Sequence, residues 1–236
     1  MELLLSPEAW IAFATLTALE LVLGIDNVIF ISILVDKLPA EQRERARKLG
    51  LFMAMFMRIC LLLALAWIVG LVAPIFSLGS QAFSGRDLIL MGGGLFLLWK
   101  STTEIHQTLE GAAHSNGSPV KATFWSVIAQ IMVIDLVFSL DSIITAVGMV
   151  EEVQVMVAAV IASVALMMVF ARSISQFVSE HPSIKMLALS FLVVVGVVLV
   201  AEGFEHHIPK GYVYFAMAFS VAVEMLNIRY RKKSKP

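Results

Sequence analysis

The sequence predicts an all-α polytopic membrane protein with seven transmembrane helices. Hydrophobic residues make up 59% of its 236 residues and charged residues only 15%, whereas soluble domains average about 25% charged residues. The mean hydropathy is +0.89, and a soluble core of this size cannot enclose so much apolar surface. A net charge of -1 excludes the basic footprint that a nucleic-acid partner requires, and the single cysteine, Cys60, excludes a disulfide framework.

Seven apolar segments are candidates for bilayer-spanning helices, which need about 20 residues each. In chain order they are residues 10–35, 49–76, 88–101, 123–150, 153–178, 184–201 and 212–228. Turn-forming residues separate them, at Pro39, 77–85, 111–119, Pro182 and 209–211. The first segment follows no basic region and is too long for a signal-peptide core, so we expect it to remain as a helix.

The basic residues are distributed unevenly between the two sides of such a bundle. Of the 17 Lys and Arg residues, only Arg86 and Lys210 fall in loops on one side, while Arg58 and Arg172 fall within spans. The others, including the basic loop at 43–48 and the tail, lie on the opposite side. Because cytoplasmic loops carry an excess of Lys and Arg, we predict an external N-terminus and a cytoplasmic C-terminus.

The first and fourth spans share a sequence pattern. Each contains two carboxylates six residues apart, and a small oxygen-bearing side chain follows the second. These residues are Glu20, Asp26 and Asn27 in the first span and Asp135, Asp141 and Ser142 in the fourth. An arginine follows 32 residues after Asp26, at Arg58, and 31 residues after Asp141, at Arg172.

We interpret this pattern as an internal duplication within a single transmembrane domain, residues 1–236. Residues 1–105 and 122–207 would be two three-helix repeats, followed by a seventh helix at 211–230. A three-span unit repeated in tandem enters the membrane in opposite directions. Such inverted repeats are typical of secondary transporters, whose binding sites lie near the membrane midplane where the repeats meet.

The intramembrane carboxylates predict a cation site. Each costs about 2.5–3.5 kcal/mol to insert, and such residues usually mark ion or proton paths. Carboxylate, amide and hydroxyl oxygens suit hard divalent cations such as Mg²⁺, Ca²⁺ and Mn²⁺. The six oxygen-bearing residues of the two spans are therefore the candidate ligands, with Arg58 as a candidate charge partner of Asp26 or Asp135. The alternative is that the acids are protonated or paired with arginine and only hold the bundle together.

The antiparallel spans predict two layers of carboxylates. Six residues of helix rise about 9 Å and turn the side chains about 120° apart, so one straight helix does not direct both of its acids at one ion. We expect Glu20 level with Asp141 on the outer side and Asp26 level with Asp135 on the inner side. Unwinding of the first helix at Gly24 would instead allow one merged site.

At these residues the chain resembles the TerC family of integral membrane proteins. Residues 20–39, ELVLGIDNVIFISILVDKLP, and residues 135–142, DLVFSLDS, match its two signatures. The likeness covers nearly the whole chain and is greatest to a short branch without CBS domains. The resemblance implies a seven-helix protein of the bacterial inner membrane, allied to the LysE-type transporter superfamily, in which several relatives are regarded as exporters of Mn²⁺ or other metals. The resemblance implies that the family's acidic signature residues correspond to the same six candidate ligands.

The leading hypothesis is export of a divalent metal cation, Mn²⁺ first, by alternating access. Protons would be the counter-ion, because carboxylates release a metal when they are protonated. We expect no enzymatic activity and no permanently bound cofactor, with lipid and the transported ion as the partners.

Two alternatives stay open. A non-transporting membrane partner in stress or secretion complexes would tolerate Asn or Gln at all four acids. An intramembrane aspartyl protease would use two buried Asp residues as a dyad, but Leu23, Gly24 and Ile25 stand before Asp26 where a GxGD motif is expected. The oligomeric state is not predicted.

The predicted orientation is testable with fusions. A reporter joined after Lys235 should read as cytoplasmic and one near Met1 as external, because the basic residues gather on the side of the C-terminus. Paired green fluorescent protein and alkaline phosphatase fusions at both ends measure this. A cytoplasmic N-terminus would contradict the opposed orientation of the two repeats.

Overall fold

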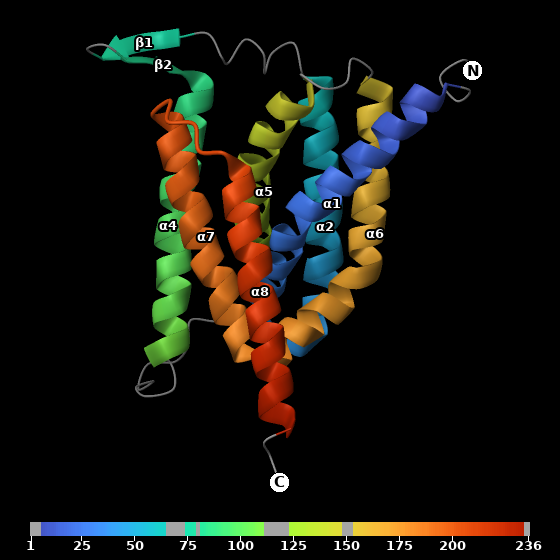
Figure 1. Ribbon diagram of the computed structural model, residues 1–236, viewed down its shortest axis with the longest axis vertical. Helices are drawn as coiled ribbons and strands as arrows, with labels where there is room; N and C mark the ends of the chain where they lie inside the picture. The colour runs from blue at the N-terminus through green and yellow to red at the C-terminus, as the bar shows by residue number, and fades with distance from the viewer. Residues whose placement is uncertain (1–5, 65–73, 79–80, 111–122, 148–152, 234–236) are drawn as a thin grey trace.

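The computed structural model describes residues 6–64, 74–78, 81–110, 123–147 and 153–233. Within these ranges the protein is a bundle of long helices with one small hairpin (Figure 1). The elements are α1 (Pro7–Val35), α2 (Ala40–Leu63), β1 (Pro74–Leu78), β2 (Gln81–Ser84), α4 (Gly85–Glu110), α5 (Phe124–Val147), α6 (Val153–Glu180), α7 (Pro182–Gly203) and α8 (Lys210–Lys233). Each predicted span overlaps one of these helices, and the all-α class is confirmed.

The predicted end of the second span is wrong. Residues 49–76 were expected to form one helix, but Pro74 and Phe76 lie in β1, which pairs antiparallel with β2. Proline donates no backbone hydrogen bond and is tolerated at a strand edge or bulge, and the ladder shifts register between Pro74 and Phe76. Phe76 stacks on Phe83 at 5.4 Å, and Phe83 meets Phe204 edge-on at 6.1 Å. Apolar character alone therefore does not distinguish the first residues of β1 from the end of a membrane span.

Two helices continue past their apolar segments into polar sequence. The basic stretch 43–48, expected in a loop, lies in the first turns of α2, where Glu44 pairs with Arg47 and, at 3.2 Å, with Lys48. Oppositely charged residues that are three or four positions apart stabilise a helix. Residues 102–110 extend α4 in the same way.

The helix α1 continues through Gly24, where unwinding was considered. The backbone from Pro7 to Val35 is helical throughout. A Cβ at Gly24 would lie only 1.9 Å from Cε of Met167 on α6. The glycine therefore serves close packing of α1 on α6, and a merged site formed by unwinding at Gly24 is not what the structure shows.

Three helix pairs make up most of the bundle: α1 with α6, α2 with α5, and α4 with α7. The α4–α7 pair meets at two glycines, because a Cβ on Gly94 would lie 2.7 Å from the carbonyl oxygen of Gly196, and one on Gly196 would lie 3.0 Å from that of Gly94. Small residues allow such close approach of membrane helices. The helix α8 packs mainly on α7.

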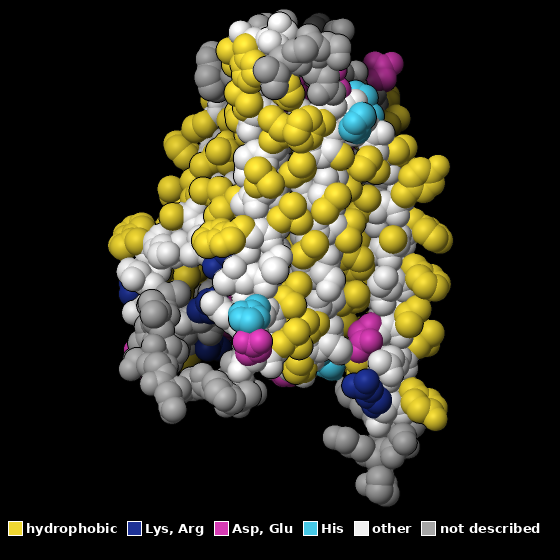
Figure 2. Space-filling view, turned by 90° about the vertical axis from the view of Figure 1, so that its left-hand side faces the viewer, with side chains coloured by type: hydrophobic (Ala, Val, Ile, Leu, Met, Phe, Trp, Pro, Cys, Tyr) yellow, Lys and Arg dark blue, Asp and Glu magenta, His cyan; other side chains and the backbone are white. Residues whose placement is uncertain are grey.

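The outer surface of the bundle is apolar. Figure 2 shows hydrophobic side chains over the middle of one face and charged side chains towards the ends. Large side chains such as Trp125, Val169 and Phe215 are exposed. Three described helices are long and apolar enough to cross a membrane, namely Val153–Glu180, Pro182–Gly203 and Gly211–Arg231, and Phe124–Ser139 is a shorter apolar helix. Seven crossings stay a prediction.

The glycine contact between α4 and α7 is testable with a matched pair of variants. Gly94→Ala should destabilise the protein by about 1–3 kcal/mol, because its Cβ would overpack the Gly196 carbonyl. Gly92→Ala is the control, since nothing lies within 4 Å of its Cβ, and alanine is the better helix former by up to about 1 kcal/mol. Thermal unfolding in detergent measures both. Equal melting temperatures would contradict the close approach.

Candidate functional site

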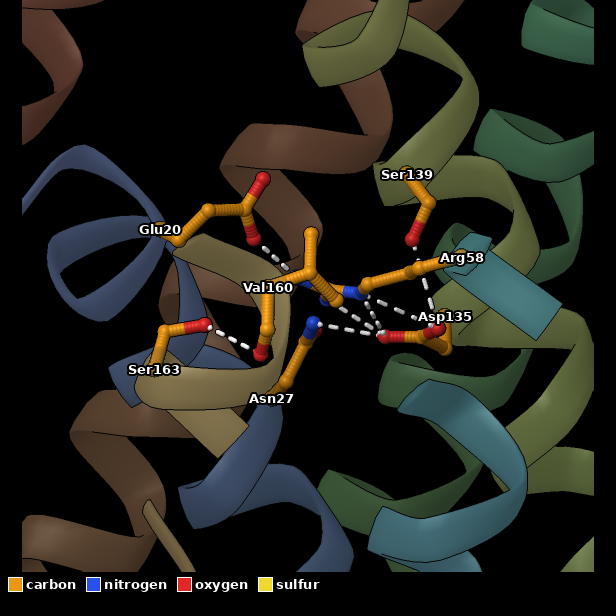
Figure 3. A network of polar contacts seen from close by, with 7 residues as sticks. All are labelled: Glu20, Asn27, Arg58, Asp135, Ser139, Val160 and Ser163. Carbon is orange, nitrogen blue, oxygen red and sulfur yellow. Dashed lines mark hydrogen bonds and ion pairs between the residues drawn. The ribbon is translucent and has the colours of Figure 1, made fainter. Parts of the chain in front are cut away.

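The interior of the bundle holds a buried polar cluster, which we call the Arg58 cluster (Figure 3). Its members are Glu20 and Asn27 from α1, Arg58 from α2, and Asp135 and Ser139 from α5. Arg58 is 5% exposed, and Asn27 and Asp135 are each 4% exposed. Buried apolar residues of α1 and α5, such as Val28 and Ile134, flank these residues along the two helices.

The Arg58 guanidinium lies between two carboxylates. Its Nη1 pairs with Glu20, its Nη2 lies 2.5 Å from Asp135 Oδ1, and its Nε lies 3.1 and 3.3 Å from the two Asp135 oxygens. The planar fork of guanidinium donors suits two carboxylates at once. A buried charge requires such pairing, and here one arginine on α2 joins α1 to α5.

Two neutral donors complete the surroundings of Asp135. Asn27 Nδ2 donates to Oδ1 at 3.2 Å, and Ser139 Oγ donates to Oδ2 at 3.2 Å. Ser139 lies one turn after Asp135 on the same helix, so α5 supplies both members of that bond. An ionised carboxylate has about four lone-pair sites. With these donors and Arg58, the Asp135 carboxylate is fully engaged.

The side-chain oxygen of Asn27 has no hydrogen-bond partner among the described residues. Its Oδ1 is buried and accepts no hydrogen bond from the described part of the chain. The opposite amide orientation would direct this oxygen at the Asp135 carboxylate, so the network fixes the assignment. A buried acceptor with no donor needs an explanation. An amide oxygen beside two carboxylates is the kind of ligand that a hard cation binds.

The structure brings together three of the six candidate ligands, Glu20, Asn27 and Asp135. The side chains of the other three, Asp26, Asp141 and Ser142, lie outside the described residues. Among the side chains that the structure does describe, there is no group of three or more His, Cys, Asp or Glu that could hold a metal ion. A complete ligand set therefore stays a prediction.

Arg58 bridges the two predicted layers at Glu20 and Asp135. They were assigned to the outer and the inner layer, yet both contact the same guanidinium. Pairing with Asp135 was one of two options considered for Arg58, whereas its contact with Glu20 was not foreseen. The reason is the length of the arginine side chain, whose fork joins acids at different heights.

The spacing of residues within α1 indicates which of its polar side chains share a face. Glu20 and Asn27 are seven residues apart, which is close to two helical turns and puts them on one face. The predicted site is based instead on the six-residue spacing of Glu20 and Asp26. Ser139, four residues after Asp135, was missed for the same reason.

Two buried acids outside the candidate set, Glu104 and Asp87, make contacts that stabilise the structure. Glu104, 2% exposed, pairs with Lys37 and, at 2.9 Å, with Lys100. Asp87 accepts hydrogen bonds from the backbone nitrogen and the hydroxyl of Ser84 at 2.9 and 2.6 Å, while Ser84 Oγ accepts from the Asp87 nitrogen. This reciprocal pattern caps the start of α4. These contacts account for both acids structurally.

The sequence is similar to proteins of one known family. Residues 5–235 match the model described as integral membrane protein TerC family. The chain is 54% identical over 228 residues to the UPF0053 inner membrane protein YgdQ of Escherichia coli K12, covering 97% of this chain and 96% of that protein. It is 54% identical over 235 residues to a UPF0053 protein of Haemophilus influenzae, covering 99% of each.

A longer relative matches over part of its length. The UPF0053 inner membrane protein YoaE of Escherichia coli K12 is 50% identical over 228 residues, which are 96% of this chain and 44% of YoaE. No solved structure matches the chain. The resemblance drawn from the two acidic signatures is confirmed by the family match.

The energetic coupling in the Arg58 cluster is testable by a double-mutant cycle. Arg58→Met and Asp135→Asn should each destabilise the protein by about 3–5 kcal/mol, because each leaves a buried charge poorly paired. The double variant should lose less than the sum of the two, by about 0.5–3 kcal/mol, as contacting residues do.

Unfolding in detergent measures the four variants of the cycle. The control cycle joins Arg58→Met with Glu180→Gln, which changes an exposed acid near the end of α6, and it should be additive. Additivity in both cycles would contradict the paired arrangement of Arg58 and Asp135.

Proposed function

Since the chain belongs to the TerC family of integral membrane proteins, we propose that it transports a divalent metal cation across the bacterial inner membrane. Mn²⁺ is the first candidate and export is the proposed direction. The names of YgdQ and YoaE, which are inner membrane proteins, support this location. The excess of basic residues near the C-terminus supports a cytoplasmic C-terminus and an external N-terminus.

One observation carries the proposal: carboxylates and an unpaired amide oxygen gather inside an apolar bundle. Glu20, Asp135 and Asn27 supply oxygen ligands of the types that Mg²⁺, Ca²⁺ and Mn²⁺ prefer. We propose that Asp26, Asp141 and Ser142 complete the ligand set. Ionisable residues in a membrane bundle are expensive and usually mark ion paths.

The pairing of helices supports an inverted-repeat scaffold. If residues 1–105 and 122–207 are repeats, α1, α2 and α4 correspond to α5, α6 and α7. A two-fold axis would then exchange the α1–α6 contact with the α5–α2 contact and map the α4–α7 contact onto itself. These are the three main contacts of the bundle. A site between two such halves is typical of carriers that work by alternating access.

We further propose that protons are exchanged for the metal. Protonation of Glu20 and Asp135 removes the negative charge that binds a cation, so metal and protons compete for the same oxygens. An inward proton gradient would then drive export.

The two alternatives have less support. In an aspartyl dyad two carboxylates share one proton, whereas the charged partner of Asp135 is the guanidinium of Arg58. The names of the relatives contain no enzymatic term. A non-transporting partner protein would not depend on the charge of Glu20 and Asp135 for its role, although loss of the Arg58 pairing would still lower its stability.

Metal flux in proteoliposomes tests the proposal. Wild-type protein should move Mn²⁺, and Glu20→Gln and Asp135→Asn should each slow this flux by about tenfold or more, because few charges offset the dehydration of the ion. Glu180→Gln, which alters an exposed acid, is the matched control and should transport normally.

The same vesicles should be compared with Mn²⁺, Mg²⁺, Ca²⁺ and Zn²⁺ at two pH values. A proton-coupled exporter should respond to an imposed pH gradient. If both acid variants moved Mn²⁺ at the wild-type rate, the transport site would lie elsewhere in the chain.

A further inference from the structure

The Arg58 cluster already holds a cation, and that cation belongs to the protein. The guanidinium lies between Glu20 and Asp135 and contacts both (Figure 3). Arg58 is 5% exposed, so water does not compensate its charge to any large extent. The arginine is therefore bound as a substrate cation would be, by two carboxylates inside the bundle.

Asp135 has no oxygen position to spare while Arg58 is bound. Oδ1 accepts from Arg58 Nε at 3.1 Å, from Arg58 Nη2 at 2.5 Å and from Asn27 Nδ2 at 3.2 Å. Oδ2 accepts from Arg58 Nε at 3.3 Å and from Ser139 Oγ at 3.2 Å. Because the single hydrogen on Nε is shared between the two oxygens, these five contacts come from four donors, which match the roughly four lone-pair sites of a carboxylate. A metal ion can coordinate Asp135 only after a donor has left.

Arg58 is the donor best able to leave. It provides three of the five contacts to Asp135, and it comes from α2, whereas Ser139 belongs to the same helix as Asp135. Its side chain is long and has several rotatable bonds, so the charged group can withdraw without movement of the helix. The same withdrawal frees Glu20, whose carboxylate Nη1 contacts.

Asn27 shows that the cluster is suited to a cation other than arginine. Its amide nitrogen supports Asp135, but its oxygen is buried and without a hydrogen-bond donor in the described part of the chain. The arginine leaves this acceptor unused. A metal ion held by Asp135 would be within reach of an additional oxygen ligand from the adjacent amide.

We propose that Arg58 is a tethered competitor of the transported cation. Its guanidinium occupies the cation position in the metal-free protein and must withdraw before a divalent ion binds. The inference rests on the proposed function, because it assigns Arg58 a role in the same transport site.

The competition also selects by charge. The guanidinium neutralises one of the two carboxylates, and a monovalent ion in its place would neutralise no more. A divalent ion neutralises both. Divalent ions can therefore displace the guanidinium of Arg58 from the two carboxylates, whereas Na⁺ or K⁺ cannot. This makes Arg58 a residue that determines specificity.

The second arginine singled out by the sequence provides a matched control. Arg172 follows Asp141 as Arg58 follows Asp26, but it is exposed on α6. Arg172→Ala removes the same charge without vacating the cluster. Arg58→Ala vacates it.

Equilibrium binding of Mn²⁺ to the purified protein in detergent tests the proposal. Arg58→Ala should bind Mn²⁺ about tenfold or more tightly than wild type. If Arg58 leaves the site open in at most about a tenth of wild-type molecules, the apparent affinity of wild type is lowered about tenfold or more. Arg172→Ala should match wild type. Mn²⁺ binding to Arg58→Ala should also become sensitive to Na⁺ and K⁺, since these ions no longer have to displace the guanidinium.

Added guanidinium ion distinguishes occupation of the site from a distant charge effect. At low, non-denaturing concentrations it should compete with Mn²⁺ in Arg58→Ala, where the position is vacant, and leave wild type unaffected. Arg58→Lys serves if the alanine variant does not fold. It keeps the charge, but one ammonium cannot span both acids as the fork does, so Mn²⁺ should bind more tightly than to wild type.

Each result decides the matter. If wild type transports Mn²⁺ but the folded Arg58 variants bind it no more tightly, the tethered-competitor role is overturned and the transport function stands. If wild type neither binds nor moves Mn²⁺, the proposed function fails, and this inference fails with it.

Discussion

Burial of a positive charge between two negative charges is the constraint on which the centre of this protein depends. Arg58 from α2 holds Glu20 of α1 and Asp135 of α5, so three helices must remain in register for any of these charges to be tolerated. Replacing buried ion pairs with apolar residues is often neutral or stabilising. Stability alone is therefore a weak reason for this cluster, whereas the proposed cation transport would account for it.

Close packing of the helices helps to keep the charged cluster buried. Small residues bring the helices close: Gly24 faces Met167, Gly50 faces Ile131, and Gly94 meets Gly196. Side chains of the neighbouring helix fill the space beside Gly24 and Gly50, and the backbones approach closely at Gly94. Within the Arg58 cluster the described polar side chains pair with one another. The one exception found among the described residues of the cluster is the oxygen of Asn27, which is one of the proposed metal ligands.

Much of this architecture follows from simple sequence patterns. Long apolar segments predicted the helices, and rare acids indicated that α1 and α5 contribute to a buried polar cluster, because both signals come from the cost of placing polar groups in lipid. The start of β1 was missed because Ile75 and Phe76 after Pro74 are as apolar as the residues of a span. The Arg58–Glu20 contact was missed because it joins two helices, and the spacing of residues along the chain does not predict how far a long side chain extends to another helix. The shared face of Glu20 and Asn27, by contrast, follows from helical periodicity.

The most direct measurement is the position of Mn²⁺ itself, by anomalous scattering from crystals of the protein grown with the metal. The account predicts one strong peak among α1, α2 and α5, bound by Asp135 and the side-chain oxygen of Asn27, with the Arg58 guanidinium withdrawn from Asp135. A peak elsewhere, with Arg58 still paired to Glu20 and Asp135, would contradict it.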